Sequence, residues 1–135
     1  MKTLLLMRHA KSSWKDPSVP DHDRPLAKRG QRDSHRMGEL LGKRELIPQL
    51  ILSSSAVRAA QTASTINEIC GINLPVTISD KLYLAEAETY ISELAQTSDD
   101  IERVMLVGHN PGLESLLQIL SAVFGAFAHG GNDVR

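Results

Sequence analysis

Three short apolar runs along the chain contain no alternating polar residues. They occupy positions 4–7, 50–52 and 104–107. Uninterrupted runs of this length are typical of strands that are covered on both faces within a parallel sheet. A weaker run at 76–78 follows Pro75 and predicts a short or edge strand. The pattern therefore predicts a sheet of mostly parallel strands.

Between and after these runs, apolar residues recur at helical spacing. The pattern predicts helices at 27–43, from the serines at 53–55 to 69 or 70, at 88–96, and from Asn110 onward. The serines are expected to cap the second helix, and Asn110 to cap the fourth with Pro111 at its first helical position. The expected inward-facing residues are Met37, Leu40 and Leu41; Ala59, Ala63, Ile66 and Ile69; Ile91, Leu94 and Ala95; and Leu113, Leu116, Leu117 and Leu120. Alternating strands and helices predict an α/β fold, a three-layer sandwich whose mostly parallel central sheet is flanked by helices.

Composition fits a single globular domain. The chain has 135 residues, of which 41% are hydrophobic and 23% charged, which argues against disorder. A formal net charge of −1 excludes a generic nucleic-acid binder. The single cysteine, Cys70, cannot form an internal disulfide and is interpreted as an inert packing residue, so we expect a reducing, cytoplasmic location. No apolar run is long enough to span a membrane, and we expect no membrane partner.

The near-neutral total conceals an uneven distribution of charge. Residues 1–36 contain nine Lys or Arg and four Asp or Glu, a balance of +5, whereas the other 99 residues contain six and twelve, a balance of −6. A cluster of this kind is usually a solvated helix face. The alternative is an anion site near the N-terminus.

The residues that follow the predicted strands favour an anion site. Arg8 and His9 end the first strand, Arg58 lies one turn beyond the second, and His109 follows the strand at 104–107. Because ligands bind beyond the carboxyl ends of parallel strands, these four side chains are expected at one edge of the sheet. Each alone is more often structural. Together they offer guanidinium donors that match phosphoryl oxygens, and imidazoles able to act as nucleophile or proton donor.

Other chemistries lack their motifs. The chain has no paired-histidine or paired-cysteine zinc motif, no glycine-rich nucleotide loop and no serine nucleophile elbow. We therefore expect no metal and no organic cofactor.

Four motifs in order resemble the histidine phosphatase superfamily, whose fold is phosphoglycerate mutase-like, and within it the small SixA-type phosphohistidine phosphatases. They are the segment 8–14 (RHAKSSW), the segment 24–30 (RPLAKRG), the segment 53–63 (SSSAVRAAQTA) and the segment 107–112 (VGHNPG). The resemblance covers about residues 3–120. It implies a histidine phosphatase domain over 1–124 and a glycine-rich tail over 125–135, with the last strand of the usual fold missing.

The resemblance also implies roles for individual residues. His9 would be the nucleophile that accepts the phosphoryl group, and Arg8, Arg58 and His109 would surround its oxygens. Arg24 would be an additional phosphate contact. Glu86 is the candidate general acid, although no recognisable motif surrounds it; Asp16, Asp21 or Asp23 are alternatives in the first loop.

Three functions remain open on this basis. The first is hydrolysis of phosphohistidine on a protein, through a covalent phosphohistidine on His9. The second is hydrolysis of a small phosphomonoester, and the third is a phosphate-binding module without turnover. An imidazole leaving group has a conjugate-acid pKa of about 6.5, so it needs less help from an acid than an alcohol does. The lack of a recognisable motif around the candidate general acid therefore favours the first function.

Overall fold

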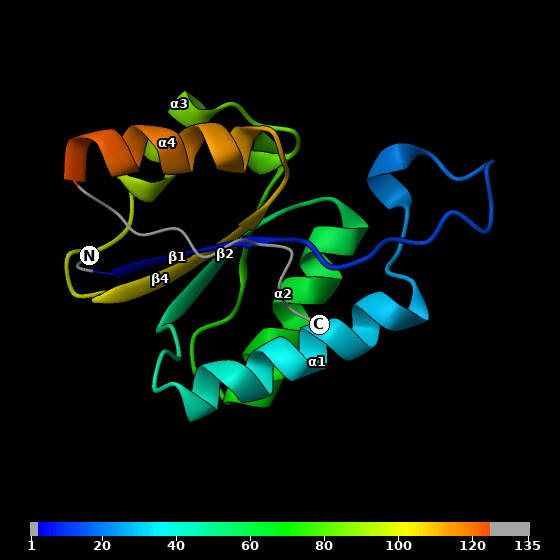
Figure 1. Ribbon diagram of the computed structural model, residues 1–135, viewed down its shortest axis with the longest axis horizontal. Coiled ribbons are helices and arrows are strands. Elements are labelled where there is room, and N and C mark those ends of the chain that lie inside the picture. Colours follow the sequence, from blue (N-terminus) through cyan, green and yellow to red (C-terminus); the bar gives the residue numbers. More distant parts are fainter. Residues whose placement is uncertain (1–2, 125–135) are drawn as a thin grey trace.

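The computed structural model describes residues 3–124, in which strands and α-helices alternate (Figure 1). The strands are β1 (Thr3–Arg8), β2 (Leu50–Ser54), β3 (Thr77–Ser79) and β4 (Arg103–Gly108). The α-helices are α1 (Lys28–Lys43), α2 (Val57–Cys70), α3 (Ala87–Leu94) and α4 (Gly112–Phe124), and the short 3-10 helices are η1 (Asp21–Asp23) and η2 (Asp80–Leu82).

The four strands form one parallel sheet in the order β1-β4-β2-β3. Helices α1 and α2 lie on one face and α3 and α4 on the other (Figure 1). The predicted α/β fold with a helix-flanked parallel sheet is therefore confirmed, and the weak apolar run forms the edge strand β3. Parallel pairing brings all carboxyl ends to one edge, so the residues that leave β1, β2 and β4 meet there.

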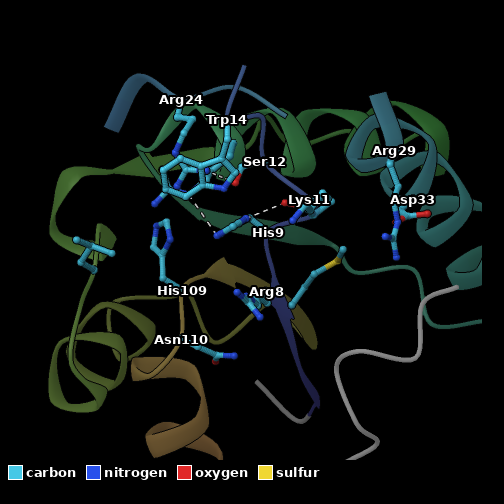
Figure 2. Close-up of a pocket in the computed structure, with 14 residues that line it drawn as sticks. Arg8, His9, Lys11, Ser12, Trp14, Arg24, Arg29, Asp33, His109 and Asn110 are labelled. Carbon is cyan, nitrogen blue, oxygen red and sulfur yellow. Dashed lines mark hydrogen bonds and ion pairs between the residues drawn. The ribbon is translucent and has the colours of Figure 1, made fainter. Parts of the chain in front are cut away.

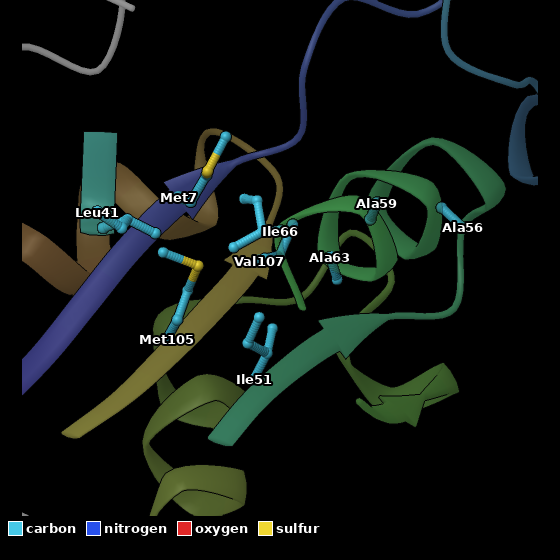
Figure 3. Packing of buried hydrophobic residues seen from close by; sticks show 9 residues of the cluster. All are labelled: Met7, Leu41, Ile51, Ala56, Ala59, Ala63, Ile66, Met105 and Val107. Carbon is cyan, nitrogen blue, oxygen red and sulfur yellow. The ribbon is translucent and has the colours of Figure 1, made fainter. Parts of the chain in front are cut away.

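The core consists of one apolar cluster on each face of the sheet. Ile51, Met105 and Val107 point towards α1 and α2, where they pack with Ala63 and Ile66 (Figure 3). On the opposite face the cluster contains Leu52, Val104 and Leu106 from the strands and Leu82, Ala87, Tyr90, Leu94, Leu113 and Leu116 from the helical layer. Side chains that alternate across β4 thus enter both clusters, which explains why its sequence lacks polar positions.

Several helix faces differ from the prediction. Ile91 is 41% exposed, and Leu40 and Ile69 are 39% and 38% exposed. In α3 the buried face is instead formed by Ala87, Tyr90 and Leu94. This set follows helical spacing as well, so periodicity alone did not distinguish the two faces.

Two helix starts are also corrected. The N-cap of α2 is Ala56, whose side chain makes no capping bond. Ser54 Oγ accepts from the Ala56 amide at 3.2 Å and also contacts His109, and Ser55 Oγ contacts His22. Helix α4 begins at Gly112, so Asn110 and Pro111 form a turn before it rather than its cap and first residue.

Two glycines of α1 provide a matched test of packing against the loop that follows β1. A Cβ on Gly30 would overlap the carbonyl oxygen of Lys11, whereas a Cβ on Gly42 would meet nothing within 4 Å. We expect Gly30→Ala to lower the free energy of unfolding by about 1–3 kcal/mol through overpacking. Gly42→Ala should raise it by about 0.5–1 kcal/mol, because alanine favours helix. Urea unfolding of both variants checks this, and equal effects would contradict it.

The predicted tail at 125–135, and with it the question of a missing last strand, lies outside the described residues. Within residues 3–124, β1 is one edge of the sheet. None of the helices in this range is both long and apolar enough to cross a bilayer.

Candidate active site

A cavity of about 480 Å³ opens at the carboxyl edge of the sheet (Figure 2). The five cationic or imidazole residues expected from the sequence all line it: Arg8, His9, Arg24, Arg58 and His109. They come from the end of β1, the loop before α1, the first turn of α2 and the residue after β4. The fold therefore brings together the residues that the strand ends and the resemblance indicated.

The backbone around His9 is held by neighbouring elements. Pairing of β1 with β4 places Arg8 opposite Gly108, and the His9 amide continues it by donating to the Gly108 carbonyl at 3.1 Å. The next amide, of Ala10, donates to Thr62 Oγ1 of α2 at 3.1 Å. His9 is thus positioned by a strand on one side and a helix on the other.

The hydrogen bonds of the His9 ring define its tautomer. Nδ1 lies 2.8 Å from the carbonyl oxygen of Ala10, and a carbonyl can only accept, so Nδ1 carries the proton. Arg58 Nε donates to His9 Nε2 at 3.3 Å. The lone pair of the neutral ring is therefore on Nε2, which is the nitrogen available for nucleophilic attack.

His109 lies beside His9, with ring centroids 5.2 Å apart. Its Nε2 is 2.7 Å from Ser54 Oγ, and its buried Nδ1 has no hydrogen-bond partner within the part of the chain that the structure describes. The backbone amide of His109 donates to the hydroxyl of Tyr90 at 3.1 Å. A Cβ on Gly108 would overlap that hydroxyl, so the close approach of Tyr90 requires glycine there.

Both imidazoles are held neutral. Burial lowers the pKa of His9 to about 4, with further lowering by Arg58, Arg8 and Arg24. Burial also lowers the pKa of His109 to about 4, and the adjacent His9 lowers it further. At neutral pH the site therefore holds two uncharged imidazoles among fixed guanidinium charges.

These pKa values predict how the site and the fold respond to acid. His9 and His109 should remain neutral and available down to about pH 5 and protonate near pH 4. In the unfolded chain a histidine protonates at about pH 6.5. Between the folded and unfolded pKa values the unfolded state therefore binds more protons than the folded state, and the free energy of unfolding should decrease as pH falls. NMR titration of the imidazole resonances checks both values. A midpoint near 6.5 for His9 would contradict the prediction.

Asp21 connects the two buried arginines. Its carboxylate accepts from Arg24 Nη2 at 3.0 Å and Arg58 Nη2 at 3.1 Å, and also from the Tyr83 hydroxyl. Arg58 Nη1 donates to the Asp21 backbone carbonyl at 2.7 Å. Hydrogen bonds from Tyr83 and Arg24, together with Arg58, hold the pKa of Asp21 well below its ordinary value. Asp21 is therefore ionised and unsuited to donate a proton near neutral pH.

The other candidate acids lie outside the cavity that contains His9. Glu86 is exposed at the start of α3 and lines a neighbouring cavity, which shares Leu84 and Asn110 with the first. Asp16 bonds to Ser18, which lowers its pKa, and Asp23 lies against His22. The structure thus brings no candidate general acid together with His9.

Other residues of the site were not singled out from the sequence. Ser12 accepts a hydrogen bond from Arg24 Nη1, and Ser54 contacts His109. Tyr83 packs edge-on against both His22 and His109. Ser12 belongs to the first motif and Ser54 to the third, so their motif positions were the available signal. Tyr83 carried none.

Among residues 3–124, no group of three or more His, Cys, Asp or Glu side chains is arranged to hold a metal ion.

The fold is an α/β sandwich of the kind found in solved SixA structures. Residues 4–86 match the family model described as the histidine phosphatase superfamily, branch 1. The chain belongs to this superfamily, and its similarity to solved SixA structures places it with the SixA type.

Three similar proteins illustrate the relationship. A SixA protein from Agrobacterium tumefaciens is 34% identical, with a TM-score of 0.77 over 91% of this chain and 83% of the other. A protein histidine phosphatase SixA complexed with tungstate is 25% identical, with a TM-score of 0.75 over 87% and 75%. An uncharacterized chloroplastic protein from Arabidopsis thaliana is 36% identical over 89% of this chain, which spans only 59% of that relative.

Proposed function

We propose that the protein hydrolyses phosphohistidine on a protein or peptide through a covalent phosphohistidine on His9. The observation that supports this most directly is the neutral His9 ring, with Nε2 unprotonated beside Arg58 in an open cavity. The similarity to a protein histidine phosphatase SixA that binds tungstate, an oxyanion, supports the same substrate class. A cytoplasmic location is part of this proposal.

In the first step, His9 Nε2 attacks phosphorus and the bond from phosphorus to the substrate imidazole breaks. The substrate ring leaves as neutral imidazole because its second nitrogen has taken a proton from solvent. With an imidazole pKa of about 6.5, that proton is accessible near neutral pH. Glu86, Asp16 and Asp23 lie outside the His9 cavity and Asp21 is held ionised, which fits a leaving group that takes its proton from solvent.

In the second step, water attacks phosphorus and the bond to Nε2 breaks. This releases inorganic phosphate, frees one proton to solvent, and restores His9 with its proton on Nδ1. Arg8, Arg58, Arg24 and His109 would stabilise the negative charge that accumulates on the phosphoryl oxygens in both transition states. The bond from Nδ1 to the Ala10 carbonyl keeps the ring oriented throughout.

The substrate class can be tested by comparing kcat/KM for a phosphohistidine peptide, phosphoserine and a sugar phosphate. We expect the phosphohistidine peptide to be preferred by at least about tenfold, equivalent to about 1.4 kcal/mol of transition-state stabilisation. Preference for the sugar phosphate would overturn the proposal in favour of a small-molecule phosphomonoesterase.

The phosphate-binding module without turnover can be tested separately. Rapid denaturation during turnover should trap a phosphoenzyme that is stable in base and labile in acid. Failure to trap it, together with binding of phosphate and no turnover, would support the non-catalytic module.

A further inference from the structure

Trp14 is an unusual feature of the cavity. It is the only tryptophan of the chain, it is 69% exposed, and it lines the cavity that contains His9. A tryptophan usually buries most of its surface. Trp14 contributes to neither apolar core cluster. Core packing therefore does not explain its position.

One face of the indole ring is covered by the guanidinium group of Arg24. The guanidinium carbon of Arg24 lies 3.7 Å from the centroid of the Trp14 ring (Figure 2). Arg24 is itself only 7% exposed and is held by Ser12 and Asp21. Because Arg24 covers one face, the exposed surface belongs to the other face and the ring edges.

The backbone at Trp14 is also constrained. The neighbouring amide of Ser13 donates to the Pro25 carbonyl at 2.8 Å, and Ser12 forms a bridge with Leu26. The segment that carries Trp14 is thus attached to the segment that carries Arg24. Trp14 is thus held among the residues that line the cavity, with one face of its ring against Arg24.

From this geometry, and resting on the proposed function, we propose that Trp14 binds the planar leaving group of the substrate. The phosphoryl group would lie among the arginines beside His9, and the imidazole ring of the substrate phosphohistidine would pack on Trp14. Aromatic pairs contribute beyond their buried area. The cavity would then recognise both ends of a phosphoimidazole. The arginines would bind the phosphoryl group, and Trp14 would bind the imidazole ring.

Kinetics with two substrates separate this role from a structural one. Phosphoramidate offers the same kind of phosphorus–nitrogen bond but no ring. We expect Trp14→Ala to raise KM for a phosphohistidine peptide about 3–10-fold, as for loss of one aromatic pair, and to leave kcat/KM for phosphoramidate within about twofold. Trp14→Phe should recover most of the loss. Ile78→Ala, which removes another exposed apolar side chain, is the matched control and should change neither substrate.

Fluorescence provides a direct reading because the indole is unique. In His9→Ala, which cannot form the phosphoenzyme, the phosphohistidine peptide should change the Trp14 emission more than phosphoramidate or inorganic phosphate does.

The outcomes distinguish the two proposals. If wild type hydrolyses the peptide but Trp14→Ala loses activity equally on both substrates, Trp14 acts only by supporting Arg24 and this inference is overturned. It is also overturned if Trp14→Ala changes neither substrate, in which case the ring serves another surface, such as one for a partner protein. If wild type does not hydrolyse the peptide at all, the proposed function itself fails.

Discussion

Replacing His9 with alanine is expected to lower kcat/KM for a phosphohistidine peptide by about 10⁴-fold or more, the scale seen when a covalent nucleophile is removed. His9 supplies the unprotonated Nε2 beside Arg58, whereas His109 Nε2 lies 2.7 Å from the Ser54 hydroxyl. The measurement is steady-state turnover together with trapping of the phosphoenzyme, which should disappear.

The matched control is His35→Ala. His35 lies on the exposed face of α1, where it bonds to Glu39 at 2.8 Å, and it is not among the residues that line the cavity. Its variant should keep full activity. Retention of turnover within about tenfold in a folded His9→Ala variant would contradict covalent catalysis by His9.

Replacing Arg58 with alanine should have the second-largest effect, a loss of about 10²–10³-fold in kcat, comparable to removing one preorganised donor from a charged transition state. Arg58 is 3% exposed, bonds to His9 Nε2, and helps to keep the pKa of His9 low. Its loss should therefore weaken charge stabilisation and raise the pKa of His9 together. Rate measurements across pH would detect both.

Arg36→Ala serves as the control, since Arg36 has a 60% exposed side chain on α1 and only a loose pair with Asp33 at 3.7 Å. Arg58→Lys should recover a part of the activity, because lysine restores the charge without the planar fork. Equal losses in the Arg58→Ala and Arg36→Ala variants would show that the effect is one of overall charge, and would refute a specific role for Arg58.

The sequence predicted the architecture well because β1, β2 and β4 contribute apolar side chains to the clusters on both faces of the sheet. The runs at 4–7, 50–52 and 104–107 are apolar for that reason, and parallel pairing then determines which edge their following residues share. The same rule was enough to gather His9, Arg58 and His109. Arg24 lies in a loop, so only the resemblance indicated it.

The parts that could not be predicted depend on contacts between distant segments. Helix faces were ambiguous in α3, because Tyr90 and Ile91 both fit an apolar stripe and only the space beside Gly108 and Gly112 selects the larger ring. The position of Asp21 between two arginines and Tyr83 joins three segments with no shared sequence pattern. Ser54 and Ser55 resembled caps because their histidine partners are distant in sequence.

The backbone bonds that hold His9 also determine what substrate binding has to rearrange. The His9 and Ala10 amides are already engaged with β4 and α2, so the nucleophile needs no change in main-chain conformation. Arg24 and Arg58, in contrast, already donate to Asp21, and in the proposed mechanism the phosphoryl oxygens would enter that existing network. The reorganisation energy of the proposed reaction would therefore be concentrated in these two guanidinium side chains, while His9 Nε2 would start where it reacts.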